Sequence, residues 1–204
     1  EPTRTLVESP VIDRTVKPSP AKPRSFAAPV PERQRLPNGV ELVVVEKRGL
    51  PAVAFSLSLK SGASLDPLAL PGLAAFTTSM LQEGTASRSS REIAEGFESM
   101  GSQLSAMTSR EGTLLATEVL SRQWPKALGL VADLVQNPTF PEDELTRVRI
   151  ERATALRRLR DDPTALATRI APMLLYGRES PYGHPLAGTE SSIESLSRND
   201  LVSY

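Results

Sequence analysis

The chain has 204 residues, with 24 Lys and Arg balanced by 24 Asp and Glu, and it contains no Cys. A formal net charge of zero argues against nucleic acid as the main partner, because that binding needs a basic surface. The absence of Cys excludes disulfides and thiolate metal sites, and no apolar run in the sequence is long enough to span a membrane. The length suits one large domain or two small ones.

Residues 1–31 differ from the rest of the chain. They hold seven of the 18 prolines, with Lys and Arg scattered between them. Proline at this density breaks regular elements, so the segment is typical of an extended arm or linker. An arm that packs on a partner subunit is the alternative interpretation. A globular domain is predicted for residues 32–204.

The first elements of this domain are expected to be strands. Asn38-Gly39 lies between two extended runs within residues 35–46, which is the strongest short-range signal for a β-hairpin. Apolar and polar side chains alternate over residues 52–60 and predict a half-buried strand. Its inward face comprises Val53, Phe55, Leu57 and Leu59.

Residues 72–84 predict a buried helix. Proline suits the start of a helix and glycine its end, so Pro71 and Gly84 bound the segment. Apolar residues recur at steps of three and four and form one face, comprising Leu73, Phe76, Met80 and Leu81.

The remaining residues predict two further strands, at 103–108 and 113–120, and six further helices. The helices are expected at 89–100, 124–135, 142–160, from Pro163 onward with a kink at Pro172, at 191–196 and at 198–204. The side chains expected to face the core in the helix at 124–135 are Leu128, Val131, Leu134 and Val135. In the helix at 142–160 they are Leu145, Val148, Ala155, Leu156 and Leu159, and in the helix from Pro163 they are Leu166, Ile170, Met173 and Leu174. This order of elements predicts an α+β fold, a mostly antiparallel sheet covered by helices on one face.

Residues 72–85 carry more than a helical pattern. They resemble the first helix of the inverse-zincin peptidases, the M16 family of pitrilysin, insulysin and the mitochondrial processing peptidase. That helix reads Gly-Leu-Ala-His-Phe-Leu-Glu-His-Met-Leu-Phe-x-Gly-Thr in the family. The residues that match are Gly72, Leu73, Ala74, Phe76, Met80, Leu81, Gly84 and Thr85.

The resemblance extends over residues 33–204, with its motifs in the family's order. The other matching segments are 36–40, 62–66, 101–113, 134–140, 161–163, 182–185 and 188–189. In the family a further strand and a second domain of the same fold follow. The resemblance therefore implies that this chain is the N-terminal half, or less, of a longer family chain.

The residues that carry the family's chemistry are different here. Zinc hydrolysis needs three protein ligands and a bound water, and His-x-x-Glu-His supplies two ligands and the general base. By the resemblance, the two His positions fall on Ala75 and Ser79, and the catalytic Glu position falls on Thr78. The third ligand, a Glu on the later long helix, falls on Ala155, or on Thr154 if the register slips by one. We therefore expect no metal site in this chain.

Other residues offer little replacement chemistry. His184 is the only histidine, and we expect it to be a loop residue that bonds to the backbone. Glu83 and Glu151 are the carboxylates nearest to the expected ligand positions, but their spacing does not suit a metal. A nucleophile among Thr77, Thr78 and Ser79 would lack a base within helical reach.

The resemblance implies a non-catalytic subunit that pairs with a homologous zinc-bearing peptidase chain and helps to enclose and position a peptide substrate. Zinc is then expected only in the catalytic partner. Two alternatives stay open: a structural or scaffold domain of a larger complex, and an active zinc metallopeptidase with atypical ligands. The chain begins at Glu1, so we expect upstream residues to have been removed, and a periplasmic or secreted location.

Overall fold

A computed structural model describes residues 15, 17, 25–47 and 49–204. Contacts divide the chain into two compact units, residues 1–48 and 49–204, and each is described by itself. Most of the Pro-rich arm predicted for residues 1–31 lies outside the described residues. The domain predicted for residues 32–204 includes all of the second unit and the hairpin of the first.

The first unit contains the predicted hairpin. Strand β1 (Glu32–Arg35) pairs antiparallel with β2 (Glu41–Val44). The turn is closed by the amide of Leu36, which donates to the carbonyl of Val40 at 2.8 Å. Gly39 has a φ of 87°, which glycine adopts without steric cost, so the Asn-Gly signal is confirmed.

The second unit is built on a three-stranded antiparallel sheet. Its strands are β3 (Ala52–Leu59), β4 (Ser105–Thr108) and β5 (Thr113–Leu120), with β5 in the middle. Buried side chains alternate along β5, and they are Thr113, Leu115, Thr117 and Val119. This alternation marks the face of the sheet that packs on the core.

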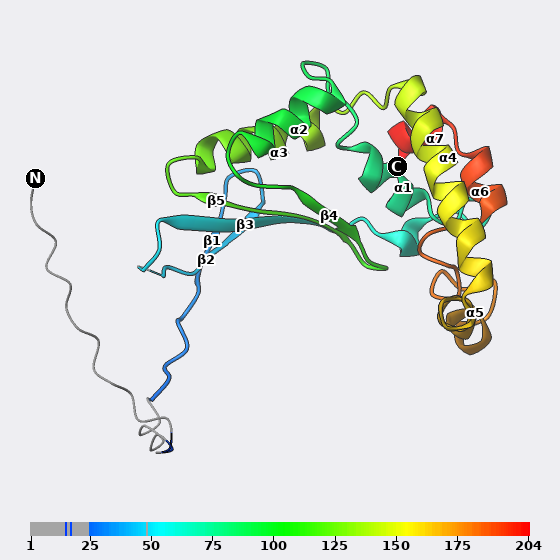
Figure 1. Ribbon diagram of the computed structural model, residues 1–204, viewed down its shortest axis with the longest axis horizontal. Coiled ribbons are helices and arrows are strands. Elements are labelled where there is room, and N and C mark those ends of the chain that lie inside the picture. Colours follow the sequence, from blue (N-terminus) through cyan, green and yellow to red (C-terminus); the bar gives the residue numbers. More distant parts are fainter. Residues whose placement is uncertain (1–14, 16, 18–24, 48) are drawn as a thin grey trace, which may run out of the picture. The chain divides into compact units, whose positions relative to one another are not determined.

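Two helices cover that face of the sheet. In Figure 1, α2 (Ser90–Glu98) and α3 (Trp124–Gln136) lie side by side over the strands; α3 contacts both α2 and β5. Helix α2 begins at a capping box, in which Ser89 and Glu92 each bond the backbone of the other. The α+β prediction with helices on one face is confirmed.

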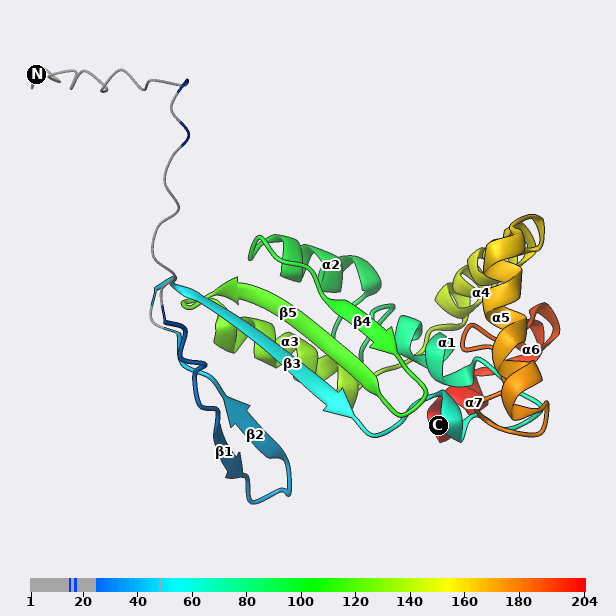
Figure 2. The same ribbon diagram turned by 90° about the horizontal axis from the view of Figure 1, so that it is seen from below.

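The other helices form a second cluster beside the end of β4. They are α1 (Leu73–Met80), α4 (Glu142–Arg158), α5 (Pro163–Tyr176), α6 (Glu190–Ser195) and α7 (Arg198–Ser203), with short 3₁₀ turns at Ala63–Leu65 and Leu159–Asp161. Helix α1 contacts β4, α4 and α7, and α4 packs against α6. Figure 2 shows α1 next to the tip of β4, with α4 and α5 beyond it.

The start of α1 is fixed by a carboxylate from the preceding loop. Asp66 accepts hydrogen bonds from the amides of Gly72, at 2.7 Å, and Ala74, at 2.8 Å, two donors that the helix itself leaves free. Gly72 has a φ of 93°, and a Cβ there would lie 2.6 Å from the backbone of Gly188. Two segments of the predicted motif series, around residues 72 and 188, therefore meet backbone to backbone.

Four sequence-based predictions in this unit are wrong in detail, and the first two concern α1 and α3. Helix α1 ends at Met80 rather than at Gly84, because Gly84 and Thr85 form isolated bridges with Ser89 and Pro138. Leu128 of α3 is 44% exposed, and its place inside is taken by Ala127 and Leu130.

The same is true of the two helices that follow. Ala155 of α4 is exposed, and Ala153 is buried instead. Helix α5 runs to Tyr176 through Pro172, but none of its described side chains is buried, and Leu174 is 77% exposed. Both helices have apolar residues on more than one face, so periodicity alone did not identify the packed one. Among the described residues, no helix combines the length and apolarity needed to cross a membrane.

Candidate functional site

The positions predicted to have lost the metal chemistry lie on two sides of α1. Ala75 and Ser79 are four residues apart and share one face, which is turned toward α4. Thr78 is turned instead toward the β4–β5 hairpin. Helix α1 thus lies between the sheet and α4.

The hydroxyl of Thr78 belongs to a chain of hydrogen bonds that ends at a backbone carbonyl. Thr108 of β4 donates to Thr78 at 2.7 Å, and Thr78 donates to the carbonyl of Ala74 at 2.8 Å. Thr113 of β5 lies 3.3 Å away and donates its own proton to the carbonyl of Ser61. Thr78 is 5% exposed, so this hydroxyl is a structural link between α1 and the sheet. It has no proton available for acid–base work.

The face formed by Ala75 and Ser79 meets an arginine. Nη2 of Arg152, on α4, lies 3.3 Å from the Ser79 hydroxyl and 3.4 Å from the Ala75 carbonyl. The Ser79 hydroxyl also donates to the carbonyl of Phe76 at 2.7 Å. The Ser79 hydroxyl therefore donates to its own helix and accepts from the Arg152 guanidinium.

The electrostatic setting of Arg152 is unusual. Burial lowers the pKa of its guanidinium from the ordinary value, and no carboxylate in the described part of the chain lies close enough to pair with it. An arginine stays charged despite such a shift. The helix face predicted to have lost a divalent cation thus carries an organic cation without a counterion.

Ala155 lies three residues after Arg152 on α4. Residues at this spacing are neighbours on a helix surface, so Ala155 and Arg152 share one stripe of the helix. Ala155 is exposed, whereas Ala75 and Ser79 are half-buried. The structure therefore brings Ala75, Ser79 and Arg152 together, all three partly buried, with the exposed Ala155 beside Arg152 on α4.

The nearby carboxylates are engaged elsewhere. Arg147 binds Glu144 at 2.7 Å and Glu151 at 2.8 Å, and it also pairs with Glu83. Burial raises the pKa of Glu83 above its usual value of 4.5, and the bond from Arg147 opposes that rise. This cluster ties the end of α1 to α4 through charge pairing.

His184 lies in a loop that is attached to the β4–β5 turn. Its Nε2 is 2.8 Å from the carbonyl of Arg178, and its Nδ1 is buried with no partner among the described residues. The hydroxyl of Tyr182 donates to Glu111 in the same turn. The expectation that His184 bonds to the backbone is met by one of its two ring nitrogens.

The family model described as insulinase, peptidase family M16, matches residues 42–189, which is more than half of the chain. The chain belongs to the M16 family.

Two M16 relatives agree with this assignment. The chain is 33% identical over 179 residues to the beta subunit of the mitochondrial-processing peptidase of Mus musculus, covering 86% of this chain and 36% of that one. It is 30% identical over 173 residues to YmxG, an uncharacterized zinc protease of Bacillus subtilis, covering 85% and 42%. The chain therefore spans about two fifths of the length of these M16 proteins.

A crystal structure provides the corresponding fold comparison. A peptidase M16 inactive domain from Pseudomonas fluorescens superposes with a TM-score of 0.80 at 30% identity, over 85% of this chain and 42% of that one. A protease from Helicobacter pylori superposes with a TM-score of 0.76 at 19% identity, which shows the same fold.

The residues of this M16 chain do not fit the zinc ion of the family's peptidases. Zinc needs three protein ligands, and Ala75 and Ala155 offer no donor atom. The Ser79 hydroxyl is already bonded, and the adjacent Arg152 guanidinium would repel a divalent cation. Among the residues that the structure describes, no group of three or more His, Cys, Asp or Glu side chains could hold a metal.

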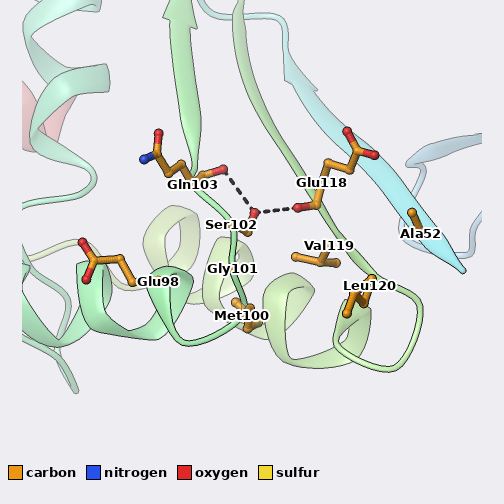
Figure 3. A pocket seen from close by; sticks show the side chains of 9 residues that line it. All are labelled: Ala52, Glu98, Met100, Gly101, Ser102, Gln103, Glu118, Val119 and Leu120. Carbon is orange, nitrogen blue, oxygen red and sulfur yellow. Dashed lines mark hydrogen bonds between the residues drawn. The ribbon is translucent and has the colours of Figure 1, made fainter.

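The M16 domain also has a hollow in its surface, at a distance from the residues discussed so far. It is an open hollow of about 700 Å³ at the end of β3 and β5, away from Ala75, Ser79 and Arg152. Figure 3 shows Glu98 and Glu118 on opposite sides of the hollow. Between them the Ser102 hydroxyl bonds the carbonyl of Glu118 at 2.6 Å, so it is not available as a nucleophile.

Two residues of the site were missed from the sequence. Thr108 and Arg152 contact the degenerate positions from β4 and α4, and neither matches a residue that carries the M16 chemistry. For Arg152 a signal was present, because it lies one helical turn before the Ala155 position.

Proposed function

We propose that this chain is part of a catalytically silent subunit of a heteromeric M16 peptidase. It would pair with a homologous zinc-bearing chain and help to enclose and position a peptide substrate. One observation carries the proposal: in an intact M16 fold, the face of α1 that should hold zinc is formed by Ala75 and Ser79 and covered by the Arg152 guanidinium.

Two relatives support the proposal. One M16 structure of the same fold, at 30% identity, is described as an inactive domain, so the fold exists without activity. A second relative is named as the beta subunit of a processing peptidase, so a chain of this type can be one component of a larger enzyme. Both properties belong to those proteins, and we extend them to this chain.

The experiment compares the chain alone with the chain in the presence of a homologous M16 peptidase that retains His-x-x-Glu-His, taken from the same organism. We expect the purified chain to bind zinc far below one equivalent and to cleave no peptide. We expect co-purification with the catalytic chain and faster peptide cleavage by the pair than by the catalytic chain alone.

A matched control uses the catalytic chain with its general-base Glu changed to Gln. That variant should still associate with this chain, and the pair should be inactive, which assigns the cleavage to the partner. Stoichiometric zinc together with chelator-sensitive cleavage by this chain alone would support an atypical peptidase instead. Co-purification with a membrane complex and not with a peptidase would support a scaffold role.

A further inference from the structure

The feature that the proposed function leaves unused is the free hydrogen-bonding capacity of Arg152. A guanidinium carries five N–H donors, and both bonds that Arg152 makes to α1 use a single nitrogen, Nη2. Nε and Nη1 donate to no residue that the structure describes, and neither atom is among those fully shielded from solvent. Donors that are unpaired and reachable define a position where a ligand can bind.

Two of the other arginines of α4, Arg147 and Arg157, have the anion that Arg152 lacks. Arg147 is more exposed, and its guanidinium is surrounded by three carboxylates. Arg157 is also exposed, and it pairs with Glu190 at 3.0 Å. Arg152 is the less exposed of these side chains, yet it has no anion beside it in the described chain. A partly buried charge without a counterion is unfavourable, and an incoming anion would offset that cost.

The surrounding residues indicate the class of anion. One guanidinium provides a single positive charge in a planar fork, which matches the single negative charge and planar shape of a carboxylate. Ala75 and Ala155 are short and carry no charge; Ala75 is partly buried and Ala155 is exposed. No acidic side chain of the described residues competes for the fork.

We propose that Arg152 forms a binding position for a carboxylate group of a peptide, on the α1–α4 face formed by Ala75 and Ser79. The inference rests on the proposed function, because a subunit that positions a peptide gives that carboxylate its source. The carboxylate can belong to an acidic side chain or to the peptide's C-terminus. In both cases the guanidinium holds a peptide at the place where active M16 chains would hold zinc.

The test uses the full chain with short alanine peptides at millimolar concentration. The first peptide has blocked ends and a central Glu, the second replaces that Glu by Gln, and the third has no Glu but keeps a free C-terminal carboxylate. Binding is followed by calorimetry and by the ¹⁵N signal of the Arg152 side chain. We expect the Glu peptide or the free C-terminus to bind about tenfold more tightly than the Gln peptide, which is the discrimination expected from one charged pair. Whichever carboxylate binds more tightly identifies the source.

Three variants separate binding from folding. Arg152→Met should abolish the preference for the carboxylate with little change in the melting temperature, because the charge that it removes has no counterion in the described part of the chain and its two bonds to α1 are long, at 3.3 and 3.4 Å. Arg152→Lys should keep part of the preference, since it keeps the charge and loses the fork. Arg91→Met is the matched control for net charge, because Arg91 is exposed and pairs with Glu95, and it should bind as the wild type does.

Several outcomes would overturn the inference. They are equal binding of the Glu and Gln peptides, no binding of any carboxylate at millimolar concentration, an unchanged preference in Arg152→Met, or an equal loss in Arg91→Met. A lower melting temperature in both Arg152 variants, with no preference in the wild type, would assign Arg152 a purely structural role. Peptide binding to this chain alone does not depend on a catalytic partner, so its failure is distinguishable from a failure of the proposed function.

Discussion

At the scale of single residues, the degenerate site is a set of small polar and apolar side chains whose hydrogen-bonding groups are largely used by the protein itself. An unpaired His or Glu on α1 would carry a desolvation cost, whereas Ala75, Thr78 and Ser79 are accommodated at little cost. Thr78 is an example, because its hydroxyl, at the position predicted for the general base, joins the helix to the sheet.

The Thr78 link can be measured by Thr78→Val, which keeps the shape of the side chain and removes the hydroxyl. The change leaves the Thr108 hydroxyl without its acceptor, so we expect a loss of about 1 to 2 kcal/mol in the free energy of unfolding. Urea denaturation followed by circular dichroism gives the value. Thr146→Val is the matched control, because Thr146 makes the same bond to the carbonyl four residues earlier but is exposed. Equal effects of the two changes would show that the link to the sheet contributes nothing.

At the scale of elements, polar networks and apolar packing hold the helices in different ways. The segment after α1 is tied to α3 by Asp133, whose carboxylate accepts bonds from Thr85 at 2.8 Å, from Ser87 at 3.1 Å, and from Arg88. Helix α3 also packs on the sheet through Leu134, which is 1% exposed. Leu174 of helix α5, in contrast, is 77% exposed and contributes to no such packing.

The Asp133 network predicts a pH dependence. The bond from Asn137, followed by the bond from Thr85, lowers the pKa of Asp133 from 3.8 to about 2. A carboxyl group with a lowered folded-state pKa contributes stability that is complete above pH 3.8 and is lost as the pH falls through about 2. Asp133→Asn should therefore lower the free energy of unfolding by about 1 to 2 kcal/mol at neutral pH.

This difference between wild type and Asp133→Asn should shrink as acid is added. Chemical denaturation at several pH values measures it. Glu118→Gln, on the exposed face of β5, should change the free energy by less than about 0.5 kcal/mol at neutral pH. A difference for Asp133→Asn that stays constant down to pH 2 would contradict the assigned network.

The packing of α3 and α5 gives a paired prediction. Leu134→Ala opens a cavity beneath the sheet and should cost about 2 to 5 kcal/mol. Leu174→Ala removes an exposed side chain and should change the free energy by less than about 0.5 kcal/mol. Thermal or urea unfolding of both variants provides the comparison. A large loss for Leu174→Ala would show that α5 is packed in solution.

At the scale of the whole molecule, the chain has the M16 fold, and the residues at the predicted metal positions do not suit zinc. The chain superposes on an inactive M16 domain with a TM-score of 0.80, so loss of the ligands does not require a different architecture. Helices α1 and α4 still face each other, but the group between them is a guanidinium instead of a metal site.

Rebuilding the zinc site tests this exchange. The quadruple variant Ala75→His, Thr78→Glu, Ser79→His and Ala155→Glu restores the family's ligands and base as the resemblance places them. We expect it to bind zinc more weakly than the same variant with Arg152→Gln added, because the guanidinium repels a divalent cation. Competition with a chelating dye measures both affinities, and circular dichroism checks that both variants fold. Equal affinities would show that Arg152 does not oppose the metal.

The sequence by itself determined the features that depend on residues close together in the chain. The Asn38-Gly39 turn, the strands around residues 105–120 and the start of a helix near Ser89 each rest on contacts over a few residues, and each was predicted. The family frame was also readable, because its motifs keep their order and spacing along the chain.

Only the tertiary structure decided which helical faces are buried and which side chain contacts Ala75 and Ser79. Arg152 and Ser79 are 73 residues apart, and their contact exists only because α4 packs on α1. Ala155 and Leu174 were expected inside, but their helices offer apolar residues on more than one side, and the packing of neighbouring elements selects one of them. The reason is physical: a hydrogen bond within a turn is set by local backbone geometry, whereas the environment of a long side chain is set by whatever distant segment is packed against it.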